Sequence, residues 1–322
     1  MKLFKIAIIL AVYLVASGIG AYMWLESYYT KGVNFAETKT IIVKKGESLS
    51  SISQRLAEEK VITHPLIFRQ IAKFTKQVSP KFGEYEFKSG ASPKSILYAL
   101  QNGKTVIRKI VIPEGYSVYE IIEVLKQTPG LEGNLPDTLE EGSLMPNTYY
   151  YHWGDQFEDV IKQMQDQMRN TITELWPYRD NNLPFETSRD AIILASIVEK
   201  ETGFGDEREM VASVFVNRLR KGMKLESDPT AVYGITKGAP LGRMPLRKDV
   251  QSQNPFNTYV ISGLPPTPIC NPGKKAIQAV LKPATSDYLF FVANGKGGHN
   301  FARTLDEHNQ NVNFYRKAIA NQ

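Results

Sequence analysis

The stretch Ser188-Arg-Asp-Ala-Ile-Ile-Leu-Ala-Ser-Ile-Val-Glu-Lys-Glu-Thr-Gly203 is the part of the chain around which the rest is organised. Its apolar residues recur at helical spacing and predict a single helix. Ser188 is the expected N-cap, Asp190 lies in the first turn, and Gly203 is the stop signal. The stripe that should face a core consists of Ala191, Leu194, Ala195 and Val198.

Two carboxylates follow this stripe, Glu199 and Glu201. Glu201 continues the apolar stripe, and a carboxylate on an apolar face is costly to bury, which raises its pKa. Glu199 lies about 200° further round the helix, at roughly 100° per residue, and so on a different flank. We therefore take Glu201 as the candidate catalytic acid. The plain alternative is that both carboxylates are solvated residues at a helix end.

The segment Ala195-Ser-Ile-Val-Glu-Lys-Glu-Thr202 closely resembles the signature of the YceG-like (MltG-type) endolytic murein transglycosylases. The resemblance covers nearly the whole chain. In that family the second glutamate of the motif is taken as catalytic, and that position is Glu201 here. One family element departs from its usual form, because Asn147 stands where an acidic residue usually follows the proline.

Further matches to the family lie downstream of the motif. They are the Asp-Pro-Thr element that begins at Asp228, the stretch Asn257-Thr-Tyr259, and Gly263-Leu-Pro-Pro266. We expect Tyr259 to be the partner of Glu201, and Asp228 either to contact sugar or to cap the helix that follows it. The expected substrate-binding residues are Glu199, Asp228, Asn257, Tyr259 and His299.

The resemblance implies cleavage of the MurNAc-β-1,4-GlcNAc bond inside peptidoglycan strands, with 1,6-anhydro-MurNAc ends and shorter nascent strands. One carboxyl group then acts as acid and as base, and no second protein carboxylate is required. A hydrolase that uses Glu199 or Asp228 as a second carboxylate is the nearest alternative. A tethered scaffold that binds peptidoglycan without turnover is another. A pyridoxal-phosphate lyase using Lys200 is disfavoured because no phosphate-binding loop is present.

Composition narrows the function classes. The chain has 322 residues, 42% of them hydrophobic, which favours two domains with ample cores. The net charge of +6 suits an anionic partner, but no long Lys/Arg cluster occurs, so nucleic acid is not expected. Cys270 is the only cysteine, and the four histidines have no ligand spacing. We therefore expect no metal and no cofactor.

The N-terminus predicts a membrane anchor. Ile6–Leu25 is an uncharged run long enough to span a bilayer, and Lys2 and Lys5 precede it. We expect a single-pass protein of the cell inner membrane, with a cytoplasmic N-terminus and the bulk of the chain in the periplasm. A cleaved signal peptide is the alternative. The expected partners are glycan strands and, through the resemblance, peptidoglycan synthases.

The expected fold class is α+β. Residues 1–30 should form the cytoplasmic tip and transmembrane helix, with a polar tether from Ser27 to about Lys39. Residues 38–88 should form a small module in the order β-α-α-β, similar to LysM peptidoglycan-binding domains, or a structural domain that binds nothing. Residues 89–150 should form a second small α+β segment, and residues 151–322 the mixed α+β catalytic domain.

Overall fold

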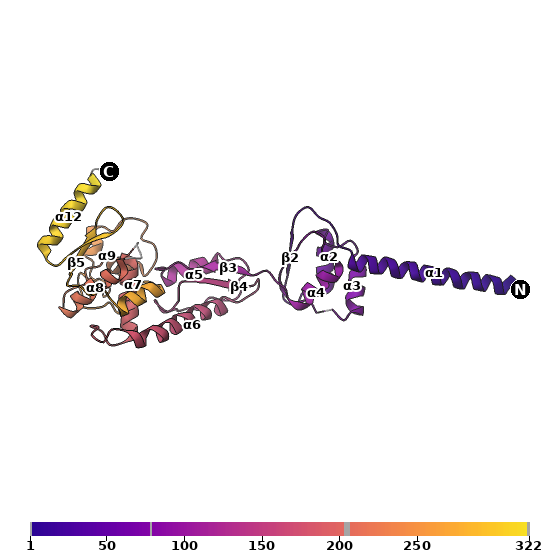
Figure 1. The fold of residues 1–322 in the computed structure, drawn as a ribbon, viewed down its shortest axis with the longest axis horizontal. Coiled ribbons are helices and arrows are strands. Elements are labelled where there is room, and N and C mark those ends of the chain that lie inside the picture. The colour runs from indigo at the N-terminus through magenta and orange to yellow at the C-terminus, as the bar shows by residue number, and fades with distance from the viewer. Residues whose placement is uncertain (1, 78, 203–206, 321–322) are drawn as a thin grey trace. The chain divides into compact units, whose positions relative to one another are not determined.

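The computed structural model describes residues 2–77, 79–202 and 207–320. The fold is mixed α+β with an apolar N-terminal helix, which confirms the expected class (Figure 1). The chain divides into two compact units, one made of residues up to 108 with 129–132 and 150–155, and the other made of the rest. Residues 89–150, assigned from the sequence to one small segment, are shared between the two units.

Helix α1 (Lys2–Thr30) begins the first unit. It is the one helix among the described residues that is long and apolar enough to cross a membrane. The helix continues beyond the apolar run, and Tyr28 and Tyr29 pack against the core of the unit. The polar tether expected from Ser27 onward is therefore wrong at its start, because these aromatic residues are helical and in contact with the core.

The rest of the first unit contains the expected order β-α-α-β. Strand β1 (Lys39–Val43) pairs antiparallel with β2 (Gly83–Phe87), and α2 (Leu49–Glu58) and α3 (Pro65–Phe74) lie between them in the chain. Helix α4 (Pro93–Asn102) follows. Ser48 and Ser92 cap α2 and α4 through their side chains, which explains why these helices begin where they do. The resemblance to LysM domains stays a prediction.

Two short strands lie where the chain passes between the units. Strand β3 (Arg108–Val111) pairs with β4 (Thr148–Tyr151). Tyr149 and Tyr151 are buried, whereas Tyr150 is 62% exposed. This alternation is that of an ordinary strand with one buried face.

The second unit is mostly helical. Its helices are α5 (Val118–Lys126), α6 (Phe157–Leu175), the short 3-10 helix η1 (Trp176–Tyr178), α7 (Ser188–Glu201), α8 (Arg208–Arg220), α9 (Asp228–Thr236), α10 (Arg247–Val250), α11 (Lys274–Leu281) and α12 (Leu305–Ala320). The hairpin of β5 (Phe290–Ala293) and β6 (His299–Ala302) precedes α12. Strand β5 is partly exposed along its whole length.

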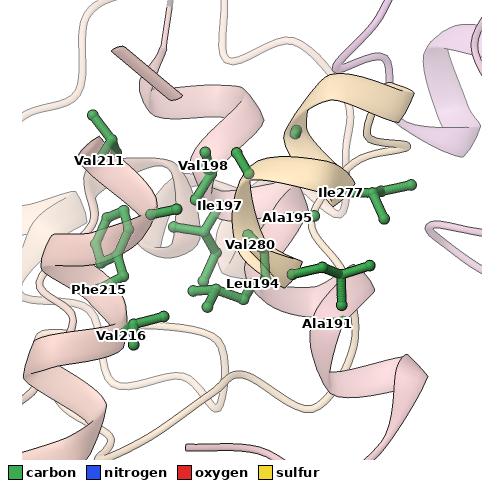
Figure 2. Close-up of a cluster of buried hydrophobic side chains, with 14 of the residues drawn as sticks. Ala191, Leu194, Ala195, Ile197, Val198, Val211, Phe215, Val216, Ile277 and Val280 are labelled. Carbon is green, nitrogen blue, oxygen red and sulfur yellow. The ribbon is translucent and has the colours of Figure 1, made fainter. Parts of the chain in front are cut away.

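Helix α7 packs against both α8 and α11, and side chains of all three helices form the buried cluster of this unit (Figure 2). Its expected stripe is buried, but Ile193, Ser196 and Ile197 on the other sides are buried too. The helix is therefore enclosed almost all round. Its N-cap is Thr187 and not Ser188 as expected. The Thr187 hydroxyl accepts a hydrogen bond from the Asp190 backbone N–H, and the two residues form a capping box. The expected stop at Gly203 lies outside the described residues.

Candidate functional site

The C-terminal end of α7 carries Glu201 into a cavity of about 400 Å³ in the second unit. The walls come from the ends of α7 and α8, the loop before α9, strand β5 and the start of α12. The lining residues are Glu201, Arg218, Leu225, Glu226, Asp228, Tyr259, Phe290, Phe291, Leu305 and His308.

Glu201 keeps some exposure at the cavity, although its carboxyl group is surrounded mostly by protein. This burial raises the pKa of the Glu201 carboxyl, and the negative charge of Asp228 adds to the effect. A hydrogen bond from the Ser227 hydroxyl to Glu201 Oε1, 2.6 Å long, and the charges of His299 and Arg218 act in the opposite direction. The net result favours the protonated form, which is the form that a general acid needs.

Asp228 and Tyr259 form a second feature of the cavity. The Tyr259 hydroxyl donates a hydrogen bond of 2.8 Å to Asp228 Oδ1. The expectation that Tyr259 partners Glu201 is therefore wrong for its hydroxyl, because Asp228 lies in reach instead. Asp228 is the first residue of α9, with Ser227 at the N-cap position. Asp228 is thus not the helix cap, and its carboxylate faces the cavity.

Arg218 holds the cavity wall in place. Its side chain is 9% exposed, and it donates to the carbonyl oxygens of Leu289, Lys224 and Leu225 at 2.6, 3.1 and 3.0 Å. These bonds tie the end of α8 to the strand β5 region and to the loop before α9. The guanidinium of Arg218 therefore cross-links backbone segments that are distant in sequence.

Asn257 is fully buried and positions Tyr259 from within its loop. Its Nδ2 donates to the carbonyl oxygens of Val250 and Ser252 at 2.8 and 2.7 Å. Its Oδ1 accepts from the Tyr259 backbone N–H at 3.0 Å. All of these bonds are internal, so the structure places Asn257 behind the cavity wall and not in its lining.

Glu199 lies in a different environment from Glu201. Its Oε1 accepts from Arg208 Nη2 at 3.0 Å, and its Oε2 accepts from the Gly273 backbone N–H at 2.8 Å. The residue is 8% exposed and does not line the cavity. The expected substrate contact of Glu199 is thus not supported by this placement, because both carboxylate oxygens hold the start of α11 and α8.

Two histidines lie on the side of the site built by β5, β6 and α12. His299 Nδ1 is 2.7 Å from Glu207 Oε2, and its backbone N–H donates to Glu207 Oε1 at 3.0 Å. His299 does not line the cavity, although its charge acts on Glu201. His308, which the sequence assigned only to the closing helix, does line it. Burial and the positive charge of Arg218 lower the pKa of His308, which favours a neutral ring.

Sequence reasoning therefore found three residues of the cavity lining, Glu201, Asp228 and Tyr259, and missed His308 and the hydrogen bond from Ser227. Ser227 precedes the Asp-Pro-Thr element, so its place beside that motif was the available signal. In the described part of the chain, no group of three or more His, Cys, Asp or Glu side chains is arranged to hold a metal ion.

Comparison with known proteins gives a consistent picture. The profile of the YceG-like family matches residues 41–314. A protein of Bacillus subtilis named endolytic murein transglycosylase is 31% identical over 85% of this chain and 83% of its own length. A protein of the same name from Streptococcus pneumoniae is 27% identical over 97% of this chain, which spans 65% of that longer relative.

A solved structure supports the same assignment. The crystal structure of a yceG-like protein from Listeria monocytogenes superposes with a TM-score of 0.53 at 32% identity, covering 85% of this chain and 98% of the other. The family profile spans most of the chain, and the relative from Bacillus subtilis exceeds 30% identity over most of both proteins. The chain therefore belongs to the YceG-like family.

Proposed function

We propose that this protein is an endolytic murein transglycosylase, a lytic enzyme that cleaves peptidoglycan strands internally. The observation that carries the proposal is Glu201, a carboxyl group with a raised pKa at the wall of a cavity. The names of the relatives from Bacillus subtilis and Streptococcus pneumoniae support the substrate and the reaction type.

The proposed reaction uses Glu201 twice. The protonated carboxyl donates its proton to the oxygen that leaves with GlcNAc as the bond from C1 of MurNAc breaks. The resulting carboxylate then accepts the proton of the MurNAc C6 hydroxyl, whose oxygen forms the new bond to C1. The product carries a 1,6-anhydro end, no water is consumed, and Glu201 regains its proton. The Ser227 hydroxyl, which donates to Glu201 Oε1, stabilises the carboxylate between the two steps.

Asp228 and Tyr259 are proposed as substrate-binding residues in the same cavity. Tyr259 offers an aromatic face against which a sugar ring can stack, and Asp228 an acceptor for sugar hydroxyls. Asn257 acts through the position of Tyr259. His299 acts on the charge state of Glu201 and not by direct contact with sugar.

We further propose that α1 anchors the enzyme in the inner membrane, with the N-terminus cytoplasmic and the rest periplasmic. Lys2 and Lys5 before the apolar run support this orientation. Cleavage close to the membrane would limit the length of nascent strands and place the enzyme beside peptidoglycan synthases. A reporter fused after the C-terminus should be active only in the periplasm, and an active cytoplasmic reporter would overturn the orientation.

The reaction is tested by digesting polymeric peptidoglycan in water enriched in heavy oxygen. Transglycosylation should leave the new ends unlabelled and resistant to borohydride, and mid-length fragments should arise early. A hydrolase is the second candidate, because Asp228 lies in the same cavity as Glu201 and is a possible second carboxylate. Labelled, reducible ends would establish the hydrolase and refute the transglycosylase.

A further inference from the structure

Helix α1 is joined to the first unit without a free tether. Tyr28 and Tyr29 pack against the buried cluster of that unit. The Gly90 N–H donates to the Val33 carbonyl oxygen at 3.0 Å. A Cβ added to Gly32 would lie 1.9 Å from the Gly90 carbonyl oxygen, so the two backbone segments are in close contact. These contacts join the C-terminal end of α1 to the rest of the first unit, whose helices α2, α3 and α4 are labelled in Figure 1.

The end of the apolar run lies beside His64, the residue directly before α3. The ring centroids of Trp24 and Tyr28 are each 5.6 Å from that of His64, and the Tyr28 hydroxyl donates to the His64 carbonyl oxygen at 3.1 Å. The run Ile6–Leu25 gives about 30 Å of helix at 1.5 Å per residue, which matches the hydrocarbon core of a bilayer. Trp24 then falls at the membrane–water interface, where tryptophan and tyrosine concentrate. His64 is held at the same depth.

An exposed apolar residue lies close to His64 in the chain. Leu66 follows His64 by two residues and is 66% exposed. Two lysines lie at the end of α1: Lys31 follows the last residue of the helix, and Lys94 Nζ is 6.0 Å from the ring centroid of Tyr29. Exposed leucine and lysine side chains are the composition of a surface that inserts shallowly among lipid headgroups.

A cavity at the same end of the first unit adds to this surface. It measures about 650 Å³ and opens between the segment after α1 and the turn before α3. Lys39 and Lys60 contribute its cations, and Glu37 contributes an anion. Residues 27–108 contain 14 Lys and Arg against 6 Asp and Glu, a net charge of +8, whereas the whole chain carries +6. This charge is complementary to phosphate groups.

We propose that this end of the first unit, formed by Lys31, His64, Leu66 and Lys94, docks on the headgroups of the same phospholipid bilayer that α1 spans. The proposal rests on the membrane anchor proposed above, and it is independent of the reaction. Docking sets the orientation of the first unit to the membrane surface. Any glycan that this unit binds is then a strand lying close to the membrane.

The test uses the full chain in phosphatidylcholine and phosphatidylglycerol vesicles, with an environment-sensitive fluorophore on a single introduced cysteine. Cys270 is buried and should not react. The variants are Leu66→Cys, Leu14→Cys inside the apolar run, and Lys45→Cys. Lys45 lies just beyond Val43, at one end of strand β1. Lys39 lies at the other end of this strand, which leads back to α1, and the two ends are about 13 Å apart.

The probe on Leu66→Cys should emit at shorter wavelength than in water and be quenched by nitroxide lipids labelled near the headgroup. The probe on Leu14→Cys should be quenched by deeply labelled lipids, and the probe on Lys45→Cys by neither. A quenched Leu14→Cys with a water-like Leu66→Cys would overturn the docking while leaving the anchor intact. Loss of quenching at both positions would overturn the docking together with the anchor. If all three variants release muropeptides as the unmodified protein does, a failure of the docking result is separate from any failure of the reaction.

Discussion

The surroundings of Glu199 and Glu201 differ sharply, although both residues belong to the last turn of α7. Glu199 is saturated, with Arg208 on one carboxylate oxygen and the Gly273 backbone on the other. Among the residues that the structure describes, Ser227 is the one side chain that donates a hydrogen bond to Glu201, which faces a cavity. A carboxyl group surrounded by protein favours its protonated form, and burial accordingly raises the pKa of Glu201. Position on one helix is therefore compatible with different roles, structural for Glu199 and, as proposed above, chemical for Glu201.

The largest effect is expected from Glu201→Gln. This variant keeps the shape of the side chain and removes the transferable proton, so turnover of peptidoglycan should fall by about 100-fold or more. Binding of glycan strands, measured by co-sedimentation, should be retained. Turnover within a few-fold of the unmodified enzyme would remove Glu201 from the reaction.

Stability of the same variant gives an independent measurement. The pKa of Glu201 is raised in the folded state, so its contribution to stability is full below the unfolded pKa and is lost as the pH rises through the folded pKa. The Glu201→Gln variant cannot ionise there. Its melting temperature should therefore decline less than that of the unmodified protein when the pH is raised. An identical decline would indicate that the carboxyl is not held in its protonated form.

Glu199→Gln should affect the fold and not the chemistry. It leaves the amide acceptor for Gly273 but removes the charge opposite Arg208, and breaking a buried ion pair costs about 3 to 5 kcal/mol. Urea denaturation measures this loss, and turnover per folded molecule should change little. The double variant Glu199→Gln, Arg208→Gln is the control, and it should recover part of the stability because no unpaired cation remains. A larger loss of turnover than in Glu201→Gln would reverse the two assignments.

A third carboxylate, Glu141, offers an intermediate case. It accepts hydrogen bonds from the Val118 backbone N–H, Asn271 Nδ2 and the Tyr233 hydroxyl at 2.9, 3.0 and 3.1 Å. Burial nevertheless raises the pKa of Glu141 to about 7. The contribution of Glu141 to the free energy of unfolding should be full at acidic pH and should fade as the pH approaches the folded pKa from below. The total loss is about 1.4 kcal/mol for each pH unit that separates the unfolded pKa from the folded pKa.

Thermal unfolding measured from about pH 5 to about pH 8, an interval that brackets the raised pKa of Glu141, checks this expectation. The matched variant is Glu141→Gln, which should show a flatter stability profile over the same interval. A profile that is equally steep in both proteins would assign the dependence to other groups.

The smallest effect is expected from Tyr259→Phe. The substitution removes the hydrogen bond to Asp228 and keeps the aromatic face. Hydrogen bonds to charged groups contribute roughly 1.5 to 3 kcal/mol when shielded, and this one is solvent-exposed, so KM should rise only several-fold with little change in kcat. Tyr259→Ala, which also removes the ring, should raise KM further. Equal effects of the two variants would exclude stacking on sugar.

Several features of the fold were predictable from local sequence. The apolar run predicted α1, and the apolar periodicity predicted α7 with Glu201 near its C-terminal end. Such signals are local because caps and helical spacing involve residues within a few positions of one another. The family motif then pointed to the same glutamate.

The partners of these residues were not predictable in the same way. The hydrogen bond of Arg218 to Leu289 joins residues 71 positions apart, and that of Glu199 to Gly273 spans 74. Periodicity gives the face on which a side chain lies but not what packs against that face, so Glu199 was expected on a substrate-binding flank.

The sequence by itself determined the apolar N-terminal helix, the helix α7 and the candidate acid. Only the tertiary structure decided that α7 is enclosed on nearly every side, that Tyr259 bonds Asp228, and that His308 lines the cavity. The physical reason is that a carboxylate's charge state depends on the donors and the solvent around it, and chain segments far apart in sequence supply both.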